Sequence, residues 1–150
     1  MNYDIKPYTV EEIPDVIAFE KQLRVEEDVY GWDIDEDYEA GVRKSFLGEQ
    51  TSLSYLAYYD GKVVGRIDCA LLRTHFDGST RAYLDWICVL KSVRHQGIAQ
   101  ALLKRLLEEL KKRGISSLVG LTASNEEAKR FYQSIPNSSM HDIGIWIDIE

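Results

Sequence analysis

The sequence predicts a mixed α/β fold, a twisted sheet covered by about four helices. Several short segments are rich in β-branched, aromatic and aliphatic residues, a composition typical of strands. Between residues 97 and 113 apolar residues recur at the spacing of an amphipathic helix, and predicted strands flank this helix on both sides, as in a βαβ crossover. With 150 residues, 45% of them hydrophobic, the chain is expected to form one domain over residues 1–150.

The N-terminal part is expected to contain one strand and two helices. A short strand is predicted at Tyr3–Tyr8. Thr9 and Glu12 have the spacing of a capping box ahead of the first helix, although Pro14 leaves the exact start of that helix open. An acidic stretch with interleaved aromatic residues then leads to a second predicted helix at Asp37–Phe46.

The middle of the chain predicts an antiparallel meander. Leu53–Tyr59 and Val63–Leu72 are rich in β-branched, aromatic and aliphatic residues. Asp60-Gly61 between them is typical of a type I′ turn. The two central residues of that turn have positive φ, which Asp and Gly tolerate. After a turn-rich connection, Tyr83–Val89 is expected to be the third strand.

The C-terminal half supplies the crossover. Gly97–Arg113 has the clearest helical pattern in the chain, and Ser116–Thr122 is a predicted strand. Ser124 with Glu127 is expected to cap another helix at Asn125–Ile135.

Composition limits the possible functions. The two cysteines, Cys69 and Cys88, lie in apolar runs without metal-ligand spacing, so we expect them to be buried and reduced, and we expect no metal site. The net charge of −7 argues against nucleic acid as a partner, although residues 1–60 carry a balance of −10 and residues 61–150 one of +3. No apolar run is long enough for a membrane span, so a cytoplasmic location without membrane contact is expected.

The most informative fragment is the junction between the third strand and the best helix. The free N–H groups and the macrodipole at a helix start favour an anion such as phosphate. Gly97 would let a ligand approach the backbone, Ala99 keeps the first turn slim, and Arg94 would add a positive charge. The alternative is an ordinary helix start with a glycine cap and a surface arginine.

These residues resemble those of the GNAT superfamily of acetyl-CoA-dependent N-acetyltransferases. The pattern Arg94-x-x-Gly97-x-Ala99 after Ile87-Cys88-Val89 is similar to the pyrophosphate motif of that family. Farther on, Asn125-Glu-Glu-Ala128-Lys-Arg-Phe131-Tyr132 is similar to its second motif. The resemblance is close over roughly Leu84–Ser134 and implies a GNAT-like acyl-CoA N-acyltransferase fold with acetyl-CoA as cosubstrate.

The resemblance also implies roles for individual residues. The main chain of Ile87 and Val89 would bind pantetheine, and the loop from Arg94 to Ala99 would hold the pyrophosphate. The complete set of implied CoA-binding residues is Ile87, Cys88, Val89, Arg94, His95, Gln96, Gly97, Ile98, Ala99, Asn125 and Phe131. Tyr132 would be the acid that protonates the departing thiolate, while packing of Tyr132 and simple helix capping by Asn125 are the alternatives.

The resemblance does not identify the base that receives the amine proton. Asp85 is the candidate, because a period of two places it on the face of Tyr83, Ile87 and Val89 within an apolar strand. A carboxylate there needs water in a cavity or an arginine partner, such as Arg66 or Arg81. His141 is a second candidate, whereas His95 and His75 are poorly placed for the amine.

The C-terminus departs from the family pattern. A Gly-Phe pair and a hairpin normally follow the second motif, whereas here the segment after Ile135 leads to one alternating strand, Ile143–Ile149. A partner subunit in a homodimer is one way to complete this end of the cleft. Lys91, where proline is frequent, is expected to matter little.

The acidic stretch is the clue to the acceptor. Its carboxylates are expected to attract a cationic acceptor. They belong to Glu26, Glu27, Asp28, Asp33, Asp35, Glu36 and Asp37. Tyr30, Trp32 and Tyr38 would add cation–π contacts, and an ordinary solvated surface is the alternative. We therefore expect acetyl transfer to a primary amine of a small cationic metabolite or antibiotic. The alternatives are a protein N-terminal or lysine acetyltransferase and a non-catalytic acyl-CoA sensor or scaffold.

Overall fold

The computed structural model describes residues 2–28, 31–123 and 125–149. The chain divides into two compact units, residues 1–119 and 120–150, and each is described by itself. The elements in chain order are β1 (Asp4–Pro7), η1 (Val10–Glu12), α1 (Ile13–Glu26), α2 (Glu36–Ser45), β2 (Ser52–Tyr59), β3 (Lys62–Arg73), β4 (Thr80–Val89), η2 (Lys91–Val93), α3 (Ile98–Lys112), β5 (Leu118–Gly120) and α4 (Glu126–Gln133). The labels η1 and η2 denote short 3₁₀ turns.

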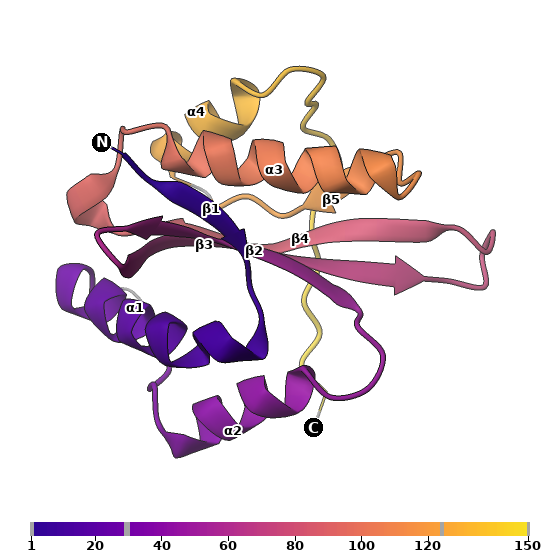
Figure 1. The fold of residues 1–150 in the computed structure, drawn as a ribbon. Helices are drawn as coiled ribbons and strands as arrows, with labels where there is room; N and C mark the ends of the chain where they lie inside the picture. The colour runs from indigo at the N-terminus through magenta and orange to yellow at the C-terminus, as the bar shows by residue number, and fades with distance from the viewer. Residues whose placement is uncertain (1, 29–30, 124, 150) are drawn as a thin grey trace. The chain divides into compact units, whose positions relative to one another are not determined.

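The sheet has the strand order β1-β2-β3-β4-β5, and the first four strands pair antiparallel with their neighbours. Figure 1 shows α1 and α2 on one face of this sheet and α3 on the other. At the β2–β3 turn, Asp60 and Gly61 have φ values of 50° and 73°, which confirms the turn predicted there. The predicted mixed α/β class, with its meander and a crossover through α3, is confirmed.

Each face of the sheet has its own apolar core. Phe19 and Leu23 of α1 are fully buried on one side, and Leu102 and Leu106 of α3 on the other. A fully buried side chain of this size stabilises the fold by about 1.5–3 kcal/mol, so these two layers fix α1 and α3 against the strands. Cys69 and Cys88 are both buried and are not joined in a disulfide, as predicted.

The sequence predicted some of the capping residues at the starts of the helices. Thr9 and Glu12 form the expected capping box, and Pro14 lies in the first turn of α1, where it interrupts no helical hydrogen bond. Helix α2 begins at Glu36, because the side chain of Asp35 accepts a hydrogen bond from the Tyr38 N–H. Ser124, the predicted cap of α4, lies outside the described residues, and Asn125 is the N-cap residue.

The predicted strand at Ile143–Ile149 is wrong. Residues 143–149 have no regular secondary structure, and the side chains of the four isoleucines in this segment are 76–97% exposed. An alternating pattern describes how a strand would bury one face, but a strand also needs a neighbour for its backbone hydrogen bonds. No described strand pairs with this segment.

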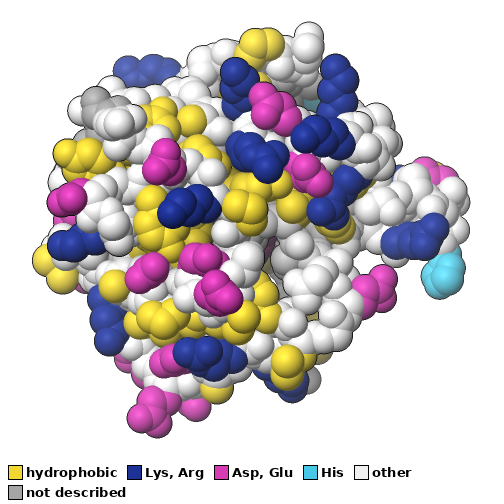
Figure 2. All heavy atoms as spheres, viewed as in Figure 1, with side chains coloured by type: hydrophobic (Ala, Val, Ile, Leu, Met, Phe, Trp, Pro, Cys, Tyr) yellow, Lys and Arg dark blue, Asp and Glu magenta, His cyan; other side chains and the backbone are white. Residues whose placement is uncertain are grey.

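The charge asymmetry of the sequence is visible on the surface. In Figure 2, which has the orientation of Figure 1, Lys and Arg side chains gather over α3. Acidic residues instead occupy the first turn of α2, where the helix dipole favours negative charge. Within the described ranges, no helix has the length and apolar character needed to cross a membrane.

Candidate active site

The junction between β4 and α3 has the geometry of an anion site. The chain leaves β4 at Val89, passes through a 3₁₀ turn and enters α3 with Gly97 as its N-cap residue. His95 and Gly97 have φ values of 63° and 81°, and a Cβ on Gly97 would meet only the Tyr3 hydroxyl, at 3.7 Å. Gly97 is therefore required by its left-handed conformation, and it has no side chain to cap the N–H groups of the first turn.

Arg94 makes two contacts within the first unit. Its Nε donates to the Val89 carbonyl at 3.1 Å, and its Nη2 forms an ion pair with the Glu27 carboxylate from the end of α1. The positive charge that was expected to face a phosphate is thus already matched by Glu27. The observed contacts hold the loop between the end of β4 and the end of α1.

A second carboxylate of α1 holds the same loop. Glu26 accepts hydrogen bonds from the N–H of Ser92 at 2.7 Å and from its hydroxyl at 3.1 Å. Partial burial acts to raise the pKa of Glu26, but the hydrogen bonds from Ser92 and Gln22 outweigh it and lower the pKa below its ordinary value. Neighbouring glutamates at the end of α1 therefore fix the segment that precedes Gly97.

Strand β4 has an edge where an extended ligand could add. Its residues Ile87, Cys88 and Val89 pair with β3, whereas its other neighbour, β5, has only three residues against the ten of β4. A strand that is only partly covered leaves backbone groups that an extended chain can bind. The role predicted for the Ile87–Val89 main chain requires such groups on the side of β4 away from β3.

Gly65 in β3 is a positioning residue that the sequence analysis missed. A Cβ at this position would lie 3.2 Å from side-chain atoms of Ile98 and Val89 and 3.3 Å from the Cys88 carbonyl. The absence of a side chain lets the first turn of α3 approach the end of β4 closely. The available signal was a glycine inside an apolar strand, which often marks close backbone approach.

Asp85 is exposed, so the expectation of a carboxylate enclosed in an apolar strand is wrong. In the register of the sheet, Trp86 pairs with Asp68 and Leu84 with Cys69, which leaves Asp85 as the extra residue of a β-bulge. The bulge interrupts the period of two on which the shared face with Ile87 was based. The arginine pairings considered for it are also wrong, because Arg66 binds Asp68 and Glu20 and Arg81 contacts Asp77.

The second unit contains the other motif on helix α4. The Oδ1 of Asn125 accepts a hydrogen bond from the Ala128 N–H at 2.8 Å, so Asn125 does cap the helix, and its amide NH₂ is not used in that bond. The rings of Phe131 and Tyr132 meet edge to face with centroids 5.1 Å apart. Burial raises the pKa of Tyr132, which keeps its hydroxyl protonated, as an acid must be.

Comparison with known proteins identifies the family. Residues 17–135 match the model of the acetyltransferase (GNAT) family. The chain belongs to this family. N-alpha-acetyltransferase 30 of Schizosaccharomyces pombe is 29% identical to this GNAT protein over 104 residues, which are 69% of each chain.

Solved structures share the fold. An aminoglycoside acetyltransferase from an uncultured soil metagenomic sample, in complex with sisomicin, superposes with a TM-score of 0.84 at 15% identity over 99% of this chain and 97% of that one. AAC(6')-Iy in complex with the bisubstrate analog CoA-S-monomethyl-acetylneamine gives a TM-score of 0.79 at 18% identity over 99% of both chains. At these identities the likeness establishes the fold of this GNAT member.

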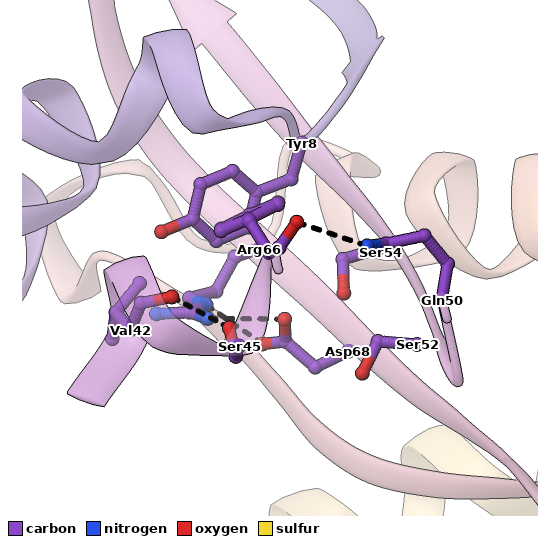
Figure 3. Close-up of a pocket in the computed structure, with 9 residues that line it drawn as sticks. Tyr8, Val42, Ser45, Gln50, Ser52, Ser54, Arg66 and Asp68 are labelled. Atoms are coloured by element: carbon purple, nitrogen blue, oxygen red, sulfur yellow. Dashed lines mark hydrogen bonds and ion pairs between the residues drawn. The ribbon is translucent and has the colours of Figure 1, made fainter. Parts of the chain in front are cut away.

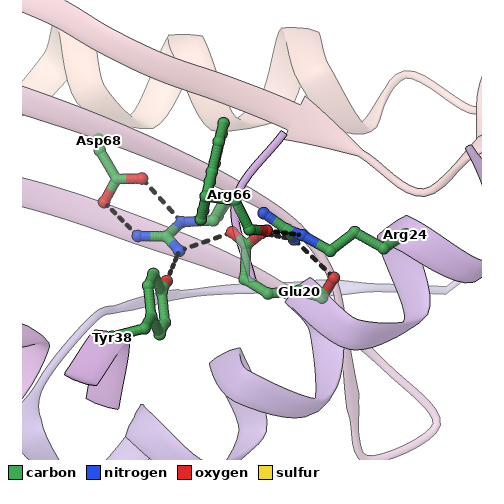
Figure 4. A network of polar contacts seen from close by, with 6 residues as sticks. Glu20, Arg24, Tyr38, Arg66 and Asp68 are labelled. Atoms are coloured by element: carbon green, nitrogen blue, oxygen red, sulfur yellow. Dashed lines mark hydrogen bonds and ion pairs between the residues drawn. The ribbon is translucent and has the colours of Figure 1, made fainter. Parts of the chain in front are cut away.

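The face of the GNAT sheet under α1 and α2 carries a buried ion network, shown in Figure 4. Arg66 donates to both carboxylate oxygens of Asp68 at 2.7 and 3.0 Å and to Glu20 at 2.9 Å. Glu20, whose side chain is 3% exposed, also accepts from Arg24 at 2.7 Å. Burial acts to lower the pKa of Arg66, but the neighbouring carboxylates raise it, so the guanidinium stays charged.

The sequence analysis did not find this network. Glu20 occupies a core position of α1, and Arg66 and Asp68 lie in the middle of an otherwise apolar strand. Charges at such positions indicate a paired, buried group, and that signal was present. Their partners come from separate segments of the chain, which periodicity alone does not connect.

Some carboxylates of the acidic stretch stabilise the fold through hydrogen bonds and an ion pair. Glu26 and Glu27 hold the loop and Asp35 caps α2, while Asp28, Asp33, Glu36 and Asp37 are exposed. Trp32 packs edge to face on Trp86 at 5.9 Å, with Arg24 4.8 Å from its ring centre. Tyr30 lies outside the described residues.

Two of the histidines considered in the sequence analysis, His141 and His75, have exposed side chains. The side chain of His141 is 74% exposed and its Nδ1 lies 3.3 Å from the Asp142 carboxylate, while His75 lies exposed in the β3–β4 turn. Among the residues that the structure describes, no group of three or more His, Cys, Asp or Glu side chains could hold a metal ion.

Proposed function

We propose that this GNAT member is an N-acetyltransferase that transfers the acetyl group of acetyl-CoA directly to a primary amine of a small cationic molecule. The observation that carries the proposal is the start of α3 at the left-handed Gly97, which a short loop connects to the partly covered strand β4. The N–H groups of Gly97, Ile98 and Ala99 would hold the diphosphate, and the Ile87–Val89 main chain would hold pantetheine. Glu26 and Glu27 position this loop.

The amine must be neutral when it attacks the thioester carbonyl. We assign its proton to Asp85, directly or through water, because the bulge presents this carboxylate on β4 next to Trp86. The new C–N bond forms as the C–S bond breaks, and the thiolate takes a proton from the Tyr132 hydroxyl. Burial of Tyr132 supports its role as the acid. The exposed carboxylates of residues 28–37 would attract a cationic acceptor.

A protein N-terminal acetyltransferase is the second candidate. The observation that favours it is the similarity to N-alpha-acetyltransferase 30. The two candidates share the CoA site and differ in the acceptor, so only the acceptor discriminates between them.

The test is thiol release from acetyl-CoA over a panel of amines that contains sisomicin, spermidine and peptides with free N-termini. Turnover with small amines supports the proposal, and turnover with peptides alone supports the second candidate. Binding of CoA without turnover on any amine would indicate a sensor or scaffold. Acetyl-CoA at 100 times its Kd should raise the free energy of unfolding by about 2.7 kcal/mol.

The phosphate loop has a matched pair of variants. Gly97→Ala and Gly114→Ala each place a Cβ on a left-handed residue, with φ values of 81° and 73°, and Gly114 lies beyond the opposite end of α3. Both should lower stability by about 1–2 kcal/mol, but only Gly97→Ala should weaken CoA binding. Equal CoA affinity in the two variants would remove the phosphate assignment.

A further inference from the structure

A small polar cavity lies on the face of the sheet that carries the ion network. It has a volume of about 120 Å³, well above the roughly 10–15 Å³ that one water molecule requires. Figure 3 shows Tyr8, Ser45, Ser52, Ser54, Arg66 and Asp68 around it. Phe46 also contributes to the lining. The cavity lies wholly within the first unit, between α2 and strands β2 and β3.

The register of the sheet places this cavity beside the proposed reaction centre. Ser54 of β2 pairs with Asp68 of β3, and Asp68 pairs with Trp86 of β4, next to the bulged Asp85. Directly paired residues lie on the same face, and neighbouring strands are about 4.8 Å apart. The floor of the cavity is thus about one strand away from the point where the acceptor amine would meet the thioester.

The charges around the cavity cancel. Asp68 is bound by two nitrogens of Arg66, and Glu20 is shared between Arg66 and Arg24, so two carboxylates face two guanidinium groups. A phosphate or carboxylate ligand would have to compete with Asp68 and Glu20 for Arg66. An ammonium group would gain little from carboxylates that are already matched. The cavity is therefore suited to an uncharged group.

The remaining lining offers hydrogen bonds and aromatic walls. Ser45, Ser52 and Ser54 contribute hydroxyls that can donate and accept, and Asp68 keeps lone pairs beyond those used by Arg66. The rings of Tyr8 and Phe46 meet edge to face at 5.1 Å. The Tyr8 hydroxyl is buried and has no hydrogen-bond partner in the described part of the chain. Such a lining suits a ligand that carries both hydroxyl groups, which can bind the serines, and C–H faces, which can pack on the aromatic rings.

Resting on the proposed function, we infer that this cavity holds an uncharged, hydroxyl-bearing ring of the acceptor, as in a sugar, while the reactive amine lies at β4. The acceptor is then an amino sugar derivative, with its cationic groups near the acidic segment and its ring against Ser54 and Asp68. A ring-free polyamine would use the acidic segment alone.

The test compares sisomicin, which contains sugar rings, with spermidine, which has none, by isothermal titration. Ser54→Val fills part of the cavity, and because Val suits a strand, the variant should fold. We expect at least tenfold weaker sisomicin binding to Ser54→Val, a smaller loss for Ser54→Ala, and less than twofold change for spermidine. Thr80→Val, at the exposed start of β4, is the matched control and should bind sisomicin as the wild type does.

Equal sisomicin affinity of Ser54→Val and the wild type would overturn the inference, and so would absence of sisomicin binding to the wild type. Failure of the proposed function gives a different result. In that case sisomicin binds in the cavity-dependent manner but no amine in the panel releases thiol from acetyl-CoA. Conversely, thiol release with spermidine and no binding of sisomicin would retain the enzyme and reject the cavity.

Discussion

The proposed phosphate loop and the ion network under α1 and α2 are built from different groups. In the loop the proposed ligand-binding groups are backbone N–H groups, and a single left-handed glycine, Gly97, precedes them. The network consists of the charged side chains of Glu20, Arg24, Arg66 and Asp68. The first two lie on successive turns of α1 and the other two on β3. The loop depends on local conformation, whereas the network depends on packing across the whole first unit.

This difference determines how each region should respond to substitution. A buried charge that loses its partner is expensive, because the remaining charge cannot return to water. A backbone site tolerates side-chain changes unless they alter the path of the chain. Substitutions in the network should therefore change stability most, and those around the loop should have smaller effects that fall mainly on CoA binding.

The largest effect is expected for Glu20→Gln. The substitution keeps the shape of the side chain but leaves Arg24 and Arg66 with one carboxylate fewer in a buried setting. Breaking a buried pair typically costs about 3–5 kcal/mol, and urea unfolding measures this loss.

The control is Glu39→Gln in α2. Glu39 also pairs with an arginine four residues later, Arg43, but the two side chains are 40% and 49% exposed. Its loss should cost less than about 1 kcal/mol. Similar losses for the two variants would mean that the network contributes no more than a surface pair.

A smaller effect is expected for Gly65→Ala, which acts where the two regions meet in β3. The added methyl group would lie 3.2 Å from atoms of both Ile98 and Val89. Overpacking of this kind costs about 1–3 kcal/mol, and it should also weaken CoA binding, because the start of α3 must shift. Gly41→Ala in α2 is the control, since its Cβ meets nothing within 4 Å and Ala favours helix. A Gly65→Ala protein with unchanged CoA affinity would show that close approach of α3 is not needed.

The same contrast explains how much the sequence could predict. The loop and the motif on α4 are each one continuous segment of the chain. The residue spacing from Arg94 to Ala99 and from Asn125 to Tyr132 was therefore sufficient to predict the family and its fold. Strands and helices with strong periodicity were also found, with boundaries shifted by a few residues. Even within the loop, the ion pair between Arg94 and Glu27 depends on the distant end of α1 and was not predictable from the motif.

Three features required information that local patterns do not contain. The bulge at Asp85 adds a residue to β4, and a period of two cannot reveal it. The partners of Arg66 lie on α1 and on its own strand, so its pairing needed the topology of the sheet. Residues 143–149 have the pattern of a strand, but a pattern does not supply a neighbouring strand.

Glu27→Gln should have a modest effect that decides the role of Arg94. Since the Arg94 and Glu27 side chains are 25% and 18% exposed, their pair contributes less than about 1 kcal/mol. If Glu27 mainly holds the loop in place, the variant should bind CoA up to about fivefold more weakly in isothermal titration, within that limit. Tighter binding would instead mean that Glu27 competes with the diphosphate for Arg94, which would support the phosphate role predicted for Arg94.

The smallest effect is expected from Glu26, and it appears only at acidic pH. Its pKa in the folded protein is lowered below the ordinary value of 4.5 by the hydrogen bonds from Ser92 and Gln22. The corresponding stability is complete above about pH 4.5 and is lost as the pH falls through the lowered pKa, because the unfolded chain takes up the proton first. Glu26→Gln should therefore flatten the decline of the unfolding free energy measured in urea between about pH 6 and pH 3. Ser92→Ala keeps the backbone donor and should flatten it less, and a decline as steep in Glu26→Gln as in the wild type would show that this contact does not tie α1 to the loop.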